Sequence, residues 1–101
     1  MRRLLIAFLL PILVVSCSSK EIVKPAPKAD FIWENVGNGL IQFTNQSTNA
    51  DVYSWQFDVY STTTSEKNPK RQFGKGKYSV SLSVQNSVGV DGITKVIEVT
   101  L

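Results

Sequence analysis

The chain has 101 residues, 11 Lys and Arg against 8 Asp and Glu, one cysteine and no histidine. Without histidine, a Ser-His-Asp triad, an imidazole general acid or base and an imidazole metal ligand are all excluded. A single cysteine also excludes an intramolecular disulfide, so the folded part must depend on its hydrophobic core alone.

The N-terminal segment has the features of a secretory leader. Arg2 and Arg3 precede residues 4–15, a run of 12 residues that is apolar throughout and contains one proline. About 20 apolar residues are needed to cross a bilayer, so the run is too short for a transmembrane helix. Residues 14–17, VVSC, resemble a bacterial lipobox, which implies cleavage after residue 16 and attachment of diacylglycerol to Cys17. The alternatives are an ordinary signal peptide with a spare cysteine and an uncleaved anchor.

The lipobox resemblance decides the chemistry of Cys17 and the predicted location. An acylated thiol is neither a nucleophile nor a metal ligand, and two or three acyl chains anchor a protein firmly where one does not. Ser18 follows the cysteine, whereas Asp at that position commonly signals inner-membrane retention in lipoproteins of bacteria with two membranes. We therefore expect a lipid anchor in the bacterial outer membrane, with the domain facing the periplasm or the cell surface.

Residues 17–28 are predicted to be the lipidated cysteine and an extended tether. Pro25 and Pro27 fix the backbone dihedral φ and favour an extended conformation. The basic excess of the chain lies in the leader and this tether, because residues 29–101 hold six basic and seven acidic residues. The charge balance therefore gives no indication of nucleic-acid binding.

Residues 29–101 are predicted to form an all-β domain. Short runs alternate between apolar and polar residues, as in residues 52–57 and 77–85, and turn sequences separate them. About six or seven such strands indicate an antiparallel β-sandwich, with Trp55 on a central strand as the core anchor. Lys95 interrupts the apolar phase of the last run, which predicts a bulge or an edge there. The GNG and GKG stretches, residues 37–39 and 74–76, are typical of hairpin turns.

Several segments in order resemble the PKD domain, an immunoglobulin-like β-sandwich. They are FTNQSTNADVYSWQF, SEKNP and GKGKYSVSLSVQNSVGVDGITKVIEV, and together they span most of residues 29–101. The resemblance implies that Tyr78 forms a tyrosine corner, a hydrogen bond from its hydroxyl back to the main chain. The chain departs from the family after Trp55, where residues 56–61 read QFDVYS instead of continuing Asp-Phe-Gly-Asp-Gly. Any calcium role of that acidic, glycine-rich loop is therefore not carried over.

Two surface features are candidate binding sites. One is a basic run that could attract an anionic glycan or an acidic protein, and its residues are Lys67, Lys70, Arg71, Lys75 and Lys77. The alternative is a solvated face whose lysines guard a strand edge. Trp33 and Tyr60 could stack on sugars or anchor a protein if their rings are exposed, and the alternative is a place at the rim of the core.

Asp58 and Glu66 are weak candidates for a metal site. Calcium requires several converging oxygen atoms, and these two acids lie in one polar loop region with Ser and Thr between them. The simpler interpretation is that both are solvated loop acids. No cofactor is predicted.

The sequence as a whole predicts a lipid-anchored, non-catalytic binding or adhesion module that contacts a protein or glycan at the cell envelope. The alternative is an accessory subunit of an outer-membrane assembly, in which the sandwich adds a β-edge to a partner. A small hydrolase is disfavoured because histidine and a free thiol are both missing.

The anchor can be tested by Cys17→Ser, which removes the thiol that accepts the diacylglycerol. We expect the variant to be released from membranes or to keep its leader, as measured by membrane fractionation and apparent size. A variant that still fractionates as mature, membrane-bound protein would contradict the lipoprotein prediction.

Overall fold

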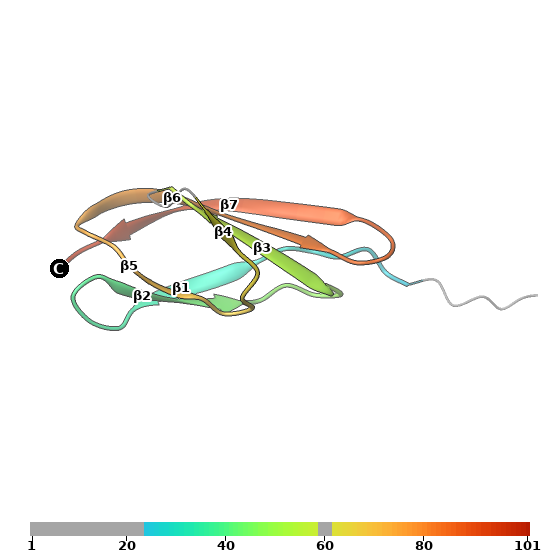
Figure 1. Cartoon of the computed structure of the whole chain (residues 1–101), viewed down its shortest axis with the longest axis horizontal. Helices are drawn as coiled ribbons and strands as arrows, with labels where there is room; N and C mark the ends of the chain where they lie inside the picture. Colours follow the sequence, from blue (N-terminus) through green and yellow to red (C-terminus); the bar gives the residue numbers. More distant parts are fainter. Residues whose placement is uncertain (1–23, 59–61) are drawn as a thin grey trace, which may run out of the picture.

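A computed structural model describes residues 24–58 and 62–101, which form two antiparallel sheets packed face to face (Figure 1). The strands are β1 Phe31–Asn35, β2 Leu40–Asn45, β3 Val52–Phe57, β4 Thr63–Thr64, β5 Lys70–Gln72, β6 Gly76–Gln85 and β7 Val90–Val99. This confirms the predicted all-β sandwich. Cys17 and Tyr60 lie outside the described residues.

The two sheets have the strand orders β1-β2-β5 and β4-β3-β6-β7. The chain crosses between them after β2, after β4 and after β5. β3 therefore lies inside the four-stranded sheet, between β4 and β6, as expected for the strand that carries the core tryptophan. β1 and β5 are the edges of the three-stranded sheet, and β4 and β7 are the edges of the other.

The two glycine turns differ in role. Residues 37–39 connect β1 to β2 as a hairpin, as predicted, and Gly39 has φ +85 where an added Cβ would collide with the carbonyl oxygen of Phe73. Residues 74–76 do not form the predicted hairpin, because they lead from β5 in one sheet to β6 in the other. The Tyr78 hydroxyl donates to the Gly74 carbonyl oxygen at 2.9 Å, so the expected tyrosine corner holds this crossing.

β6 and β7 form a long hairpin in one continuous register, from Gly76 opposite Val99 to Gln85 opposite Val90. The predicted bulge at Lys95 is therefore wrong, and the predicted edge is confirmed. Lys95 lies directly opposite Val80, which is fully buried, so its side chain starts on the interior face of the sheet.

Aromatic rings fill the space between the sheets. The Trp55 ring is fully buried, 5.0 Å from the Phe31 ring and 5.4 Å from the Phe43 ring between centroids. Phe57 stacks parallel to Trp55, with 8° between the ring planes. Most residues in the apolar phase of their strands are buried, including Ile41, Val80, Leu82, Val84, Ile97 and Val99, whereas Tyr53 and Tyr78 are half-buried and Leu101 is exposed. Phe73, which the phase argument had not assigned, is buried as well.

Trp55→Ala should lower the free energy of unfolding by about 3–5 kcal/mol, because it empties a large volume at the centre of the core. A domain of this size has about 5–15 kcal/mol in total, so the variant should be close to unfolded in denaturant titrations. Trp33→Ala is the matched control, since that ring is 37% exposed and its loss should cost clearly less. Equal losses for the two variants would contradict the central role of Trp55.

Candidate functional site

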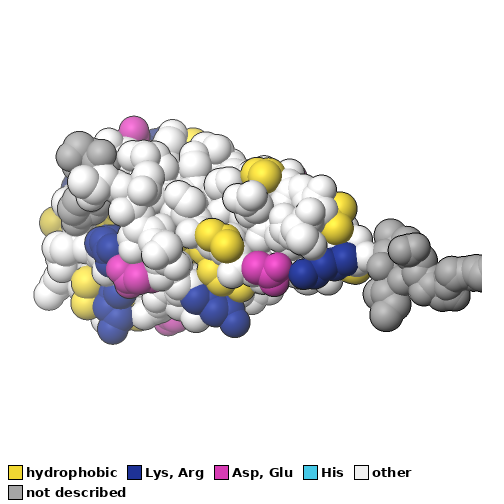
Figure 2. All heavy atoms as spheres, turned by 45° about the vertical axis from the view of Figure 1, so that its right-hand side comes forward, with side chains coloured by type: hydrophobic (Ala, Val, Ile, Leu, Met, Phe, Trp, Pro, Cys, Tyr) yellow, Lys and Arg dark blue, Asp and Glu magenta, His cyan; other side chains and the backbone are white. Residues whose placement is uncertain are grey.

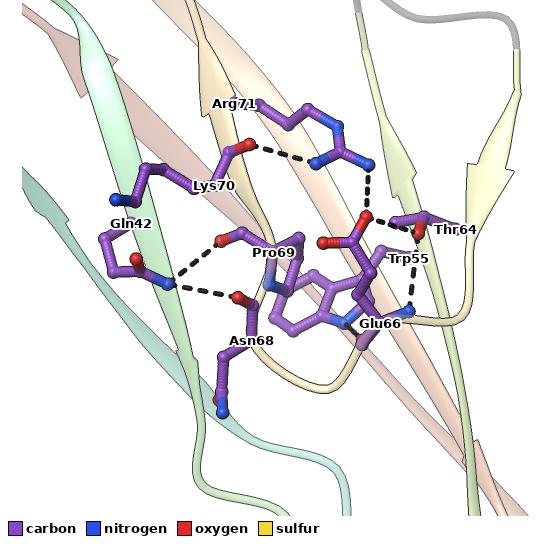
Figure 3. A network of polar contacts seen from close by, with 8 residues as sticks. All are labelled: Gln42, Trp55, Thr64, Glu66, Asn68, Pro69, Lys70 and Arg71. Atoms are coloured by element: carbon purple, nitrogen blue, oxygen red, sulfur yellow. Dashed lines mark hydrogen bonds and ion pairs between the residues drawn. The ribbon is translucent and has the colours of Figure 1, made fainter.

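A polar network on the surface joins β5 to the connection that precedes it (Figure 3). The Arg71 guanidinium donates to the Glu66 carboxylate, Nη2 to Oε2, at 2.8 Å, and the Thr64 hydroxyl donates to the same oxygen at 3.0 Å. The guanidinium carbon lies 5.7 Å from the centroid of the Phe57 ring. The main chain of Glu66 is also held, because its carbonyl oxygen accepts the indole N–H of Trp55 at 2.8 Å.

Two of the predicted site residues, Arg71 and Glu66, are therefore paired with each other in an ion pair. The hydrogen bond from Arg71, followed by the one from Thr64, holds the pKa of the Glu66 carboxyl below its ordinary value of 4.5. A carboxylate already paired with a guanidinium is a poor calcium ligand. Asp58 accepts a hydrogen bond from the Ser79 main-chain N–H at 3.2 Å. Within residues 24–58 and 62–101, no three His, Cys, Asp or Glu side chains gather in a way that could hold a metal ion.

Lys67 lies in the loop before β5 and Lys70 is the first residue of β5, and the neighbouring strand β2 fixes this stretch, residues 67–70, in place. The Gln42 amide donates to the carbonyl oxygens of Asn68 and Pro69 at 3.1 and 3.2 Å. The Asn45 side-chain amide donates to the Lys67 carbonyl oxygen, and the Asn45 main-chain N–H donates to the side-chain oxygen of Asn68. Both lysines are exposed, and neither forms an ion pair with another described residue. The loop is thus a preorganised support for two free ammonium groups.

The structure separates the aromatic candidate from the basic ones. Trp33 lies on β1, at the opposite edge of the three-stranded sheet from Lys70 and Arg71 on β5, and β2 runs between them. Its ring is 37% exposed and lies 6.0 Å from the Lys95 ammonium. Trp33 is therefore partly exposed, which is the condition set for it as a binding residue. Tyr60 lies outside the described residues, so its role stays a prediction.

A third surface had not been predicted as a site. The outer face of the four-stranded sheet has a shallow hollow of about 370 Å³, lined by small polar side chains that include Ser54, Gln56, Ser81, Ser83 and Thr94. Figure 2 shows that the upper part of the domain carries few charges, whereas blue and magenta side chains gather lower down. The hydroxyl and amide groups that line the hollow can donate and accept hydrogen bonds, so it offers contacts for binding.

Comparisons with known proteins agree with this architecture. No protein-family model matches the chain, and no curated protein matches its sequence. Among solved structures it is similar to the PKD1 domain of Vibrio anguillarum Epp, with a TM-score of 0.63 and 26% identity over 76% of this chain and 96% of that one. It is also similar to the PKD1 domain of the Vibrio cholerae metalloprotease PrtV, with a TM-score of 0.63 and 29% identity over 76% and 100%.

A third similar structure is a Methanosarcina mazei protein solved by solution NMR, with a TM-score of 0.59 and 26% identity over 91% of this chain and 63% of that one. The described residues therefore form an immunoglobulin-like β-sandwich module. More specifically, this is a PKD-like domain, and the resemblance drawn from the sequence is confirmed.

Glu66→Gln should make stability less dependent on pH. Because the folded-state pKa of Glu66 is lowered, its ion pair stabilises the fold above the ordinary pKa of 4.5 and loses that effect as pH falls through the folded-state value. The variant should therefore melt below the wild type at pH 7, and the gap in Tm should close on acidification. Glu34→Gln, at an exposed acid on β1, is the control. A gap that is constant with pH would contradict the role of the ion pair.

Proposed function

We propose that the protein is a lipid-anchored, non-catalytic binding module of the bacterial envelope, and that the loop at residues 67–70 contacts an anionic protein or glycan. The observation that carries the proposal is the pair of unpaired lysines on a loop whose main chain is already fixed. A preorganised loop loses little conformational entropy when it binds, so more of the electrostatic attraction appears as affinity. The PKD-like fold supports a module of this kind, because such domains generally have no catalysis of their own.

The lipobox-like VVSC motif supports an anchor at Cys17 in the outer membrane. The described part of the tether lies against the domain: Asn86 donates to the Pro25 carbonyl oxygen at 2.9 Å, and Lys24 pairs with Asp51 at 3.1 Å. Lys28 forms a β-bridge with Thr48. At about 3.3–3.6 Å per residue, the stretch from residue 17 to residue 24 then spans at most about 25 Å, which would keep the domain close to the membrane.

An accessory subunit of an outer-membrane assembly is the second candidate. It is favoured by β7, a strand of 10 residues that pairs with β6 on one side only. A partner could add a strand to that edge through main-chain hydrogen bonds.

The double substitution Lys67→Glu/Lys70→Glu tests the lysine loop. Reversing both charges should weaken binding to acidic ligands about five- to thirty-fold, which corresponds to about 1–2 kcal/mol. The ligands are found by pull-down with the acylated protein from its own membranes, together with an array of anionic glycans. Lys75→Glu/Lys77→Glu is the matched control, because it makes the same charge change at two other exposed lysines. An equal loss of binding in the two double variants would show that only the net charge of the domain matters, and would contradict a specific role of Lys67 and Lys70.

Two single variants extend this experiment to the aromatic candidates. Tyr60→Ala and Trp33→Ala should weaken binding only if the ligand reaches their rings, and each variant is paired with a melting curve. Loss of binding with an unchanged Tm assigns the ring to the ligand site. A large fall in Tm assigns it to the core instead.

A further inference from the structure

We propose that β7 is a self-association edge, and that it pairs antiparallel with β7 of a second copy about a two-fold axis at Ile93. The other edges of the described sandwich are short or occupied. β4 has two residues and β5 has three. β1 has five residues, and β7 side chains occupy main-chain groups at its start: Lys95 donates to the Phe31 carbonyl oxygen at 2.7 Å, and Asp91 accepts the N–H of Ala29, just before β1, at 2.7 Å. β7 is thus the one long edge in this part of the chain with an open side.

The hairpin fixes which main-chain groups of β7 point outward. The Asn86 N–H donates to the Gly89 carbonyl oxygen at 3.0 Å, so these two residues form a hydrogen-bonded pair. Pairs alternate along an antiparallel ladder, so the odd-numbered residues of β7 bond to β6 and the even-numbered ones face away from it. The outward N–H and C=O groups are therefore those of Val90, Gly92, Thr94 and Val96, and no described strand pairs with them.

Residues 90–96, VDGITKV, are self-complementary when two copies run antiparallel. With Ile93 opposite Ile93 of the second copy, each Val90 faces a Val96 and each Gly92 faces a Thr94. The two valines are 64% and 62% exposed in the single copy, on the outer face of the sheet, and the pairing brings each into contact with a valine of the other copy. Ile93, half-buried at the edge of the core, becomes enclosed at the axis.

The same register pairs opposite charges. Each Asp91 lies opposite a Lys95 of the second copy, in a non-hydrogen-bonded pair where side chains approach most closely. Each side chain has one polar atom or N–H group left for this contact. Ala29 occupies Oδ2 of Asp91 and leaves Oδ1, whereas Lys95 uses two of its three N–H groups, on Phe31 and Asp30.

Other registers do not match. Sliding the strands by two residues places Asp91 opposite Ile93 or Ile97, which leaves the carboxylate beside an apolar side chain. A shift by four residues in one direction places Lys95 opposite Lys95. An inward-facing lysine normally protects a sheet edge against pairing. Here Asp91 of a second copy neutralises the charge of Lys95, so the lysine permits pairing with that partner in that register.

Charge-matched variants test the pairing in the full, acylated chain. Two differently tagged wild-type copies extracted in mild detergent should co-purify. In Val90→Lys/Val96→Lys the new lysines of the two copies face each other, so two tagged copies of this variant should no longer co-purify. Two copies of Val90→Glu/Val96→Glu should fail to co-purify for the same reason. A lysine variant and a glutamate variant should co-purify with each other, because opposite charges then face each other. Both positions are exposed, so the fold should be unaffected, and Val52→Lys, on β3 away from the edge, is the control.

Cysteine cross-linking in intact cells tests the register. Ile93→Cys should give a disulfide-linked dimer, because the two sulfurs meet at the axis, and Thr94→Cys should not, because its copies lie too far apart. No cross-link at residue 93 together with no recovery in the mixed charge variants would overturn the proposal. Co-purification of a different protein through the same edge, lost in both charge variants and not recovered on mixing, would overturn it in favour of a foreign strand.

Discussion

The packing of Trp55 between the two sheets is the constraint on which the rest of the structure depends. With no disulfide available to this domain, the sheets are held together by apolar contact, and the indole ring touches aromatic residues from both of them. Its N–H also fixes the carbonyl oxygen of Glu66. The core therefore fixes the main chain just before Lys67 and Lys70, so the position of this candidate binding surface depends on the packing of Trp55.

Each open side of the sandwich is closed by a cation that lies over the aromatic core. On the β1–β7 side, the Lys95 ammonium lies 5.1 Å from the Phe31 ring centroid and 2.9 Å from an Asp30 oxygen. On the β4–β5 side, Arg71 lies over Phe57 and is paired with a carboxylate. A long cationic side chain covers apolar rings with its stem and keeps its charge at the surface, so the sides are sealed without extra strands.

The two proposed surfaces lie on different sides of the sandwich and can act together. Pairing through β7 leaves the lysine loop beside β5 exposed in both copies. Two linked copies would present two identical loops, and the second contact with a repetitive ligand would then be intramolecular and correspondingly stronger. A PKD-like fold by itself specifies no ligand, so the function depends on these surface residues rather than on the fold.

The sequence by itself determined the strands and most of the core, because period-2 alternation shows which residues share one face of a strand, whichever strands become its neighbours. It placed Trp55, Val80 and Leu82 correctly for this reason. Lys95 showed only that the alternation was interrupted, since its partners Asp30 and Phe31 are more than 60 residues away in the chain. The tertiary structure alone decided that residues 74–76 cross between sheets, that Trp33 and the lysine loop lie on opposite edges, and that β7 has an open side. All three depend on which strands become neighbours, and that is set by contacts between distant segments.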